Sequence, residues 1–288
     1  MSIRVGFIGL GNQGKPIAAH LAAAGLATTV FDLAPEPVAE LVAGGAVAAA
    51  SPREVGAQSD VVGICVPEDE HVKAVVFGDD GLLTGLEAGG VILIHSTILP
   101  ETAAVIAEAA APHDIVVLDA CVTGGAARAH ARQLTYLIGG PAEALERARP
   151  YFDATTELPV VHAGELGSGA KLKLCINLIT YIQWAAAYES MALARAIGLP
   201  QDVLEQAGRA SGQLTELMIQ YLATHKLPED VRSSAGFQGL MRNHMHIAEK
   251  DLAWALQLAR KAGISLPVGS LVSQSMARLY AVDDDGRR

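Results

Sequence analysis

The sequence is poor in charge, and this shortage excludes several classes of protein. Only 18% of its 288 residues are charged whereas 51% are hydrophobic, a balance that excludes an intrinsically disordered chain. Acidic residues outnumber basic residues by 31 to 21, which gives a formal net charge of −10. Nucleic acids and anionic membranes require clustered positive charge, so we expect neither as a partner.

Cysteine and long apolar runs are also scarce. Cys65, Cys121 and Cys175 are too few and too scattered for a disulfide framework, and no CxxC pair is present. The most apolar long stretch, residues 174–187, is too short and too polar to span a bilayer. The chain opens without the basic and apolar regions of a secretory signal. These features predict a cytoplasmic protein with reduced thiols.

Residues 1–163 alternate short runs rich in Val and Ile with longer Ala-rich stretches of helical period. The runs predicted as strands are residues 3–8, 28–32, 61–66, 91–94, 115–118 and 134–138. Continuous apolarity is typical of strands that are buried on both faces of a parallel sheet. Strands alternating with helices predict an α/β Rossmann-type domain with a doubly wound sheet.

Residues 164–288 show helical patterns only and predict an all-α domain for substrate binding and dimerisation. The predicted helices are residues 166–197, 201–208, 213–225, a stretch ending near 263, and 267–280. The first is much longer than the usual helix of about 11–12 residues, and it joins the two domains. Because residues 172–193 are apolar on nearly every face, this helix must be buried between domains or against a second subunit. We therefore predict a homodimer or homotetramer.

A glycine-rich turn follows the first predicted strand and opens a predicted helix, as a dinucleotide-binding fingerprint must. Its sequence is Gly9-Leu10-Gly11-Asn12-Gln13-Gly14. Gly9 permits a tight turn, Gly11 allows the backbone to approach a pyrophosphate, and Gly14 allows the helix to pack on the strand. Free N–H groups at the start of the helix then face the anion. We expect all six residues to bind the cofactor.

The choice between NAD and NADP depends on Asp32, eighteen positions after Gly14 at the end of the next predicted strand. Its carboxylate can accept hydrogen bonds from a ribose hydroxyl and would repel a 2′-phosphate. Leu33 follows, so no adjacent arginine is available to hold such a phosphate. The sequence thus predicts NAD, although Asp32 could also be a turn residue that ends its strand.

Lys173 and Asn177 are four residues apart and project from one face of the long predicted helix. An ammonium beside an amide suits a hydroxyl or carbonyl oxygen. As a carbinol loses hydride, a lysine whose pKa is lowered by partial burial can take the hydroxyl proton. Lys171 points to another face. The alternative for Lys173 is an ordinary amphipathic lysine at the surface of a buried helix.

Four motifs, in the same order along the chain, resemble those of the β-hydroxyacid dehydrogenase family, the group around 3-hydroxyisobutyrate dehydrogenase and tartronate semialdehyde reductase. They are GFIGLGNQGKPIAAHLAAAG (residues 6–25), DACVTGG (119–125), GELGSGAKLKLCIN (164–177) and EKDLAWAL (249–256). The chain departs from the family pattern at Gln13, usually methionine, and at His20, often asparagine. It also departs at Cys121, normally proline, and Thr123, normally serine.

The resemblance implies roles for individual residues. Lys173 would be the catalytic lysine and Asn177 its partner. Thr123, Gly124 and Gly125 would bind the substrate carboxylate, which agrees with the open backbone N–H groups of a Gly-Gly pair and the donor of a hydroxyl.

For the cofactor, Val66 and Pro67 would line its groove, Thr97 would lie beside the nicotinamide ribose, and Lys250 would approach the nicotinamide. The helical domain would resemble the C-terminal domain of 6-phosphogluconate dehydrogenase, although the decarboxylating 6-phosphogluconate enzymes need a much longer one.

Several basic residues have no settled role in the sequence. Arg128, His130 and Arg132 follow the substrate motif. Arg132, at a position usually occupied by glycine, implies either a substrate with an extra anionic group or a solvated loop. His244 and His246 do not share a helical face, and no third ligand is well spaced, so we predict no metal site. Residues 227–242 fit the family least well and are where we expect substrate identity to be encoded.

These observations predict an NAD-dependent oxidoreductase acting on a 3-hydroxy carboxylate, similar to 3-hydroxyisobutyrate, or on its semialdehyde. One alternative is an NADPH-dependent reductase of semialdehydes or imines, which Asp32 argues against. Related imine reductases generally lack a lysine at the position of Lys173. The other alternative is a non-catalytic NAD-binding scaffold protein, which the presence of Lys173, Asn177 and Lys250 argues against.

Overall fold

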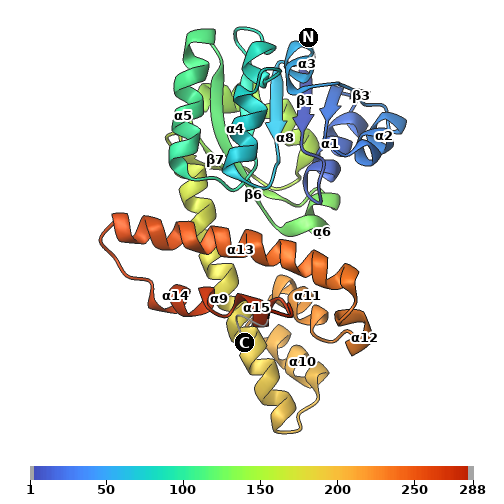
Figure 1. Cartoon of the computed structure of the whole chain (residues 1–288), viewed down its shortest axis with the longest axis vertical. Coiled ribbons are helices and arrows are strands. Elements are labelled where there is room, and N and C mark those ends of the chain that lie inside the picture. The colour runs from blue at the N-terminus through green and yellow to red at the C-terminus, as the bar shows by residue number, and fades with distance from the viewer. Residues whose placement is uncertain (1–2, 285–288) are drawn as a thin grey trace. The chain divides into compact units, whose positions relative to one another are not determined.

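The computed structural model describes residues 3–284 and divides into two compact units, Met1–Lys173 and Leu174–Arg288. The first unit contains a sheet with helices on both faces, and the second is helical (Figure 1). The predicted α/β sheet followed by a helical region is therefore confirmed. The boundary that we place after residue 163 remains a prediction.

The first unit is built on an eight-stranded sheet in the order β3-β2-β1-β4-β5-β6-β7-β8. The strands are β1 (Arg4–Ile8), β2 (Ala27–Phe31), β3 (Val47–Ala48), β4 (Val61–Ile64), β5 (Val91–Ile94), β6 (Val116–Thr123), β7 (Thr135–Gly139) and β8 (Val161–Gly164). The chain leaves β1 toward β2 on one side and returns to β4 on the other. The carboxyl ends of β1 and β4 thus flank the point where ligands bind in doubly wound sheets.

The sheet differs from the sequence-based prediction at three strands. β3 and β8 have mostly exposed residues, so neither carries the apolar run that identifies a buried strand. β7 pairs antiparallel to β6, with Thr135 opposite Thr123 and Gly139 opposite Asp119, whereas the strands from β3 to β6 are parallel to one another.

Two apolar cores, one on each face of the sheet, hold the helices in place. On one face, Ile17 and Leu21 of α1 pack with Phe7 and Tyr151. On the other face, side chains of α3, α4 and α5 pack with Ile64 of β4. The helices of this unit are α1 (Gly14–Ala23), α2 (Pro35–Ala43), α3 (Pro52–Ala57), α4 (Asp69–Phe77), α5 (Pro100–Ala110), α6 (Gly125–His130), α7 (Ala142–Arg147) and α8 (Arg149–Thr155), with 3₁₀ turns η1 (Leu82–Thr84) and η2 (Ala111–His113).

A histidine lies inside the core of the first unit. His95 is 2% exposed and stacks on Phe7 and Tyr151. Its Nδ1 lies 2.8 Å from the carbonyl oxygen of Ala120, to which it donates, and its Nε2 accepts from the Tyr151 hydroxyl at 2.7 Å. Burial lowers the pKa of His95 to about 4, so this imidazole is neutral at physiological pH.

The second unit is helical. Helix α9 (Ser168–Ala196) begins in the first unit and continues into the second. The other helices are α10 (Gln201–Ser211), α11 (Glu216–Thr224), α12 (Glu229–Arg232), α13 (Ala235–Lys261), α14 (Pro267–Ser273) and α15 (Met276–Leu279). The single helix predicted over residues 267–280 is therefore two helices. Within residues 3–284, no helix combines the length and the hydropathy that crossing a membrane requires.

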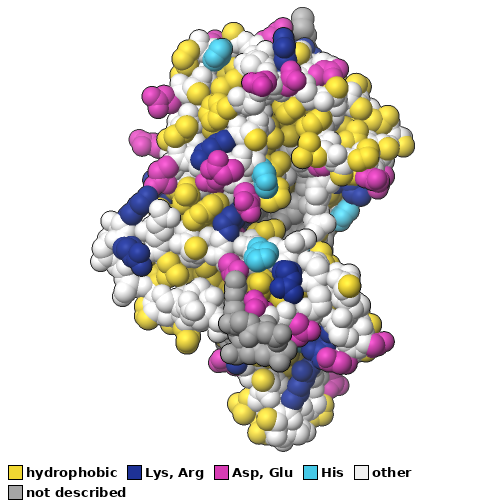
Figure 2. Space-filling model, viewed as in Figure 1, with side chains coloured by type: hydrophobic (Ala, Val, Ile, Leu, Met, Phe, Trp, Pro, Cys, Tyr) yellow, Lys and Arg dark blue, Asp and Glu magenta, His cyan; other side chains and the backbone are white. Residues whose placement is uncertain are grey.

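Helix α9 is not buried on every side in a single chain, so its predicted burial against a second subunit stays a prediction. Ile179 is 51% exposed and Leu193 is 62% exposed, with Cys175 and Ala186 also exposed at helical spacing. One face of α9 is thus accessible and largely apolar. On the face of the molecule shown in Figure 2, acidic and basic side chains are intermixed with hydrophobic ones rather than separated into blocks.

Candidate active site

The glycine turn between β1 and α1 has a different steric constraint at each glycine. Gly9 has φ +93°, and a Cβ there would collide with the carbonyl oxygen of Cys65. A Cβ on Gly14 would collide with the carbonyl oxygen of Gly9. A Cβ on Gly11 would meet no atom within 4 Å. The turn therefore needs Gly9 and Gly14 for its own packing, and it leaves the backbone at Gly11 open to a ligand.

The loops predicted to bind the cofactor lie along the carboxyl edge of the sheet. Hydrogen bonds continue past the strand ends, from Cys65 N to Ile8 O at 2.8 Å and from His95 N to Ile64 O at 2.8 Å. The N–H of Val66 donates to Ser96 Oγ at 2.8 Å, which fixes the Val66-Pro67 loop against the loop that carries Thr97.

Asp32 directly follows β2 and accepts a hydrogen bond from the glycine turn. Its Oδ2 accepts from Leu10 N at 2.5 Å and its Oδ1 accepts from Ala34 N at 2.8 Å. Asp32 is therefore a turn residue that follows β2, as one of the two interpretations states, and its binding of a ribose stays a prediction. Leu33 points outward and is 93% exposed. On the adjoining helices, the Lys15 ammonium is paired with Glu40 at 2.7 Å.

The residues predicted to bind the substrate carboxylate end β6 and begin α6. Thr123 is the last residue of β6, Gly124 has φ +131° and Gly125 has φ +77°. A Cβ on Gly125 would meet no atom within 4 Å, so its backbone is open to a ligand. The two positive φ values require glycine at this turn.

Asp119 on β6 fixes the start of α9. Its fully buried carboxylate accepts from Gly167 N at 2.7 Å through Oδ1 and from Ala170 N at 2.6 Å through Oδ2. Burial raises the pKa of Asp119, and these backbone hydrogen bonds oppose the shift. Because Ala170 is three residues before Lys173, Asp119 sets where the lysine leaves the sheet edge. Sequence reasoning quoted Asp119 in a motif without assigning it this role.

Lys173 is half-buried and lies near the end of β4. Burial raises the pKa of the Cys65 thiol to about 12, and the positive charge of Lys173 partly opposes this rise. Because Cys65 follows β4 and lies beside Gly9, Lys173 interacts electrostatically with a residue next to the glycine turn. Lys171 is exposed, as its helical position predicts.

In the second unit, Asn177 is held by a buried carboxylate. Asn177 Nδ2 donates to Asp251 Oδ2 at 2.6 Å, and the Tyr181 hydroxyl donates to the same oxygen at 3.2 Å. Asp251 is 2% exposed, and its Oδ1 lies 3.6 Å from Lys250 Nζ. That ammonium also lies 4.5 Å from the ring centroid of Trp254. Asp251 therefore orients two residues for which the sequence predicted functions.

Tyr181 was missed by sequence reasoning. Its position four residues after Asn177 on α9 was the available signal, because residues at that spacing share a helical face. Burial, together with the neighbouring Asp251, raises the pKa of Tyr181 well above its ordinary value, so its hydroxyl remains a donor.

The comparisons with known proteins agree with this arrangement. Residues 4–165 match the family described as the NAD binding domain of 6-phosphogluconate dehydrogenase. Residues 167–287 match the one described as NAD-binding of NADP-dependent 3-hydroxyisobutyrate dehydrogenase. The chain belongs to the β-hydroxyacid dehydrogenase family.

Named relatives in this family cover nearly the whole chain. An NAD-dependent L-serine dehydrogenase of Pseudomonas aeruginosa is 38% identical over 93% of this chain and 89% of its own. A 3-hydroxyisobutyrate dehydrogenase of the same organism is 36% identical over 97% and 93%. The crystal structure of a 3-hydroxyisobutyrate dehydrogenase from Salmonella typhimurium is 30% identical, with a TM-score of 0.84 over 96% of this chain and 94% of that one. The predictions of a dehydrogenase and of NAD as its cofactor are thereby confirmed.

The structure shows the surroundings of the basic residues for which the sequence indicated no settled role. Arg128 and His130 are exposed on α6. The guanidinium of Arg132 donates to the carbonyl oxygens of Asp153 at 2.9 Å and Ala154 at 3.1 Å, and it lies 3.5 Å from Glu157, with the side chain 37% exposed. Its exposure agrees with a loop at the surface, whereas these bonds to α8 were not predicted from the sequence.

His246 is exposed, with its Nδ1 3.5 Å from Glu249, and His244 is half-buried, which lowers its pKa. In the part of the chain that the structure describes, no group of three His, Cys, Asp or Glu side chains could hold a metal ion.

Proposed function

We propose that this protein oxidises the hydroxyl group of a small 3-hydroxy carboxylate, of the 3-hydroxyisobutyrate or serine class, with NAD as hydride acceptor and Lys173 as general acid/base. The observation that carries the proposal is the electrostatic interaction of the half-buried Lys173 with Cys65, which lies beside the glycine turn. The named activities of the serine and 3-hydroxyisobutyrate relatives support the substrate class.

The first unit fits NAD. The open backbone at Gly11 accommodates a pyrophosphate, and the carboxylate of Asp32 suits a ribose diol and repels a 2′-phosphate. The Lys15 ammonium is neutralised by Glu40 and does not offer that phosphate a free charge. When bound, NAD accepts the hydride from the carbinol carbon. Val66, Pro67 and Thr97 complete the cofactor residues that we propose in this unit, and Lys250 is the one that we propose in the second.

The protein residues bind the substrate and move one proton. The backbone N–H of Gly124, the open backbone of Gly125 and the hydroxyl of Thr123 bind the carboxylate. Lys173 Nζ takes the proton from the hydroxyl during oxidation and returns it during reduction. The amide of Asn177, on the same face of α9 and held by Asp251, orients the reacting oxygen.

Lys173→Ala tests the role of the lysine. Because general acid/base groups contribute about 10²- to 10⁴-fold, we expect kcat to fall by about 10³-fold, with NADH binding unchanged by fluorescence titration. Lys171→Ala, an exposed lysine two residues away, is the matched control and should retain full turnover. Retained turnover in Lys173→Ala would refute the assignment.

The substrate class is tested by following absorbance at about 340 nm during turnover with a panel of hydroxy acids, since NADH absorbs there and NAD does not. The panel should include 3-hydroxyisobutyrate and L-serine, which the named relatives use, and the corresponding alcohols without a carboxylate. We expect activity only with the carboxylates. Equal kcat/KM for the alcohols would contradict carboxylate binding at Thr123–Gly125.

We further propose that two copies of this chain pair through α9, forming a homodimer or part of a homotetramer. The proposal is supported by the apolar side chains of Ile179 and Leu193, which are more than half exposed and lie on one accessible face of a 29-residue helix. Sedimentation of wild type and of Ile179→Glu with Leu193→Glu tests it. We expect a folded monomer from the double variant, and an unchanged assembly would disprove the role of this face.

A further inference from the structure

The short helix α6 carries the proposed carboxylate-binding turn at one end and is tied to other elements at its opposite end. It has only six residues, and the two glycines that begin it have positive φ. A helix of this length is not stable alone in water, and glycines do not restrain its start. Contacts at residues 129–133 must therefore set its position.

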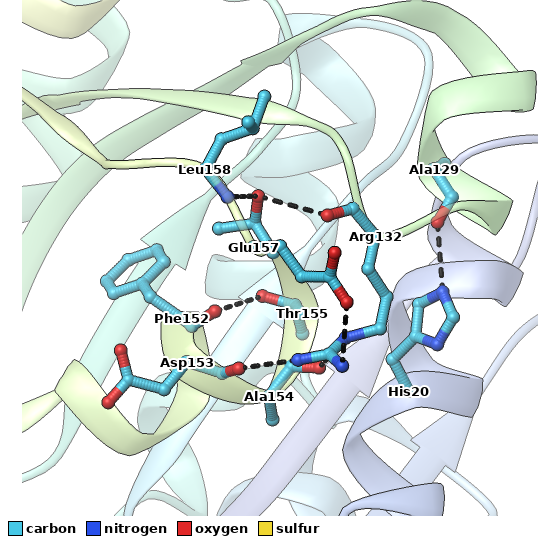
Figure 3. Close-up of polar contacts among 10 residues, drawn as sticks. His20, Ala129, Arg132, Phe152, Asp153, Ala154, Thr155, Glu157 and Leu158 are labelled. Carbon is cyan, nitrogen blue, oxygen red and sulfur yellow. Dashed lines mark hydrogen bonds and ion pairs between the residues drawn. The ribbon is translucent and has the colours of Figure 1, made fainter.

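One of these contacts is a hydrogen bond from α1, the helix that follows the glycine turn. His20 on α1 places its Nε2 3.0 Å from the carbonyl oxygen of Ala129, in the last turn of α6, and the contact is partly buried (Figure 3). Only a protonated Nε2 can bond to a carbonyl, so His20 is the donor. The α1 helix also packs directly against α6 and α8. His20 thus links the helix of the cofactor fingerprint to the helix of the substrate turn.

The second contact is made by Arg132, which lies just after α6. Its Nη2 and Nε donate to the carbonyl oxygens of Asp153 and Ala154, in the last turn of α8, where helix carbonyls lack partners within the helix (Figure 3). Its own carbonyl oxygen accepts from Glu157 N at 2.8 Å. Arg132 has φ +55°, a strained value for a residue with a side chain, so these bonds hold it in a conformation it would otherwise avoid.

We propose that His20 and Arg132 are positioning residues for substrate binding, which together fix α6 and hence the geometry of Thr123–Gly125. This inference rests on the proposed function. Neither side chain touches the substrate. Each acts by fixing the end of α6 opposite the carboxylate, so their loss affects the KM for the hydroxy acid more than the KM for NAD.

The experiment compares His20→Ala with His20→Gln, whose amide also donates a hydrogen bond. Because loss of one such bond costs about tenfold in an equilibrium constant, we expect His20→Ala to raise the KM for the hydroxy acid about tenfold. The KM for NAD should change less than twofold, and His20→Gln should restore most of the effect. The matched control is His162→Ala, since His162 Nε2 also bonds a backbone carbonyl, that of Gly140 at 2.8 Å, next to the end of β7.

Arg132 is tested with two substitutions that differ in backbone strain. Arg132→Ala removes the guanidinium and keeps the strain, whereas Arg132→Gly removes both. If positioning depends on the guanidinium, both variants raise the KM for the hydroxy acid. Of the two variants, Arg132→Gly should unfold at the higher temperature, because it is free of the backbone strain. A normal KM in Arg132→Gly would show that the guanidinium has no positioning role.

Amide hydrogen exchange measured by mass spectrometry provides a readout that does not need turnover. Exchange across residues 123–131 should rise in His20→Ala and Arg132→Ala but not in His162→Ala. If the proposed function is wrong, wild type turns over no hydroxy acid and the positioning role falls with it. If only this inference is wrong, wild type is active and His20→Ala matches His162→Ala in KM and in exchange.

Discussion

Three carboxylates in the two units make different kinds of contact. In the first unit, Asp32 and Asp119 accept hydrogen bonds from backbone N–H groups and thereby shape the main chain. In the second, Asp251 accepts from the side chains of Asn177 and Tyr181, which are 74 and 70 residues away in sequence. Where a carboxylate bonds backbone N–H groups, nearby glycines at fixed spacing allow the main chain to take the required path. Where a carboxylate bonds side chains, as Asp251 does, the fold must only bring a suitable side chain within hydrogen-bond distance.

The largest test of this contrast is within the glycine turn. Gly14→Ala forces a Cβ against the carbonyl oxygen of Gly9, which neither backbone segment can avoid without moving. We expect it to lower the free energy of unfolding by about 5 kcal/mol, the upper end of single-substitution effects. Thermal and urea unfolding measure this change.

Gly11→Ala is the matched control, because a Cβ there meets no atom within 4 Å. Its stability should match wild type, whereas its affinity for NADH should fall by about tenfold or more, since the methyl group occupies the space of the ligand. Equal stability of the two variants would remove the distinction between glycines needed for packing and those needed for the ligand.

The second test compares the two buried carboxylates. Asp119→Asn keeps one acceptor oxygen and turns an NH₂ group toward a backbone donor, so we expect about 4 kcal/mol of lost stability from two charge-assisted hydrogen bonds. Asp251→Asn has a more local effect. We expect kcat to fall about 10- to 100-fold as Asn177 loses its orientation, with less loss of stability. The reverse pattern would contradict the division between main-chain and side-chain support.

The same contrast explains what could be read from the sequence. Gly9, Gly11 and Gly14 have fixed spacing next to a strand, so the turn and its cofactor were predictable from local pattern. The partner of Asn177 was not, because Asp251 is 74 residues away and a contact at that separation leaves no local signal. The bonds from Arg132 to α8 were not predicted for a related reason. Its acceptors are backbone carbonyls, which any sequence provides.

The fold shows the same limit. β8 and the reversed direction of β7 were not predicted, because exposed edge strands lack an apolar run and strand direction depends on tertiary pairing. For α9, the sequence predicted burial between domains or against a second subunit and did not decide between them. Apolar residues on every side indicate a buried helix, but they do not show which neighbour covers each side.

The stability of the first unit should depend on pH, because its core contains the buried neutral imidazole of His95. The pKa of His95 is about 4 in the folded protein, below its ordinary 6.5, so its contribution to stability is complete above pH 6.5 and is lost as the pH falls toward 4. The loss amounts to about 3 kcal/mol by proton linkage. Urea unfolding at a series of pH values should show this slope in wild type and a shallower one in His95→Gln. An imidazole NMR signal from His95 that titrates near 6.5 would contradict the buried neutral form.

The smallest effect that we expect is on cofactor choice at Asp32. Asp32→Asn retains an oxygen for Ala34 N and removes the charge that opposes a 2′-phosphate, but it turns an NH₂ group toward Leu10 N, so thermal unfolding of the variant is measured alongside. The ratio of kcat/KM for NAD to that for NADP should fall about tenfold, which corresponds to about 1.4 kcal/mol. Glu36→Gln, which removes an acidic charge from the first turn of α2, is the control and should leave the ratio unchanged. If both variants shift the ratio equally, the preference comes from the overall charge of this edge, and the Asp32 carboxylate has no specific role in it.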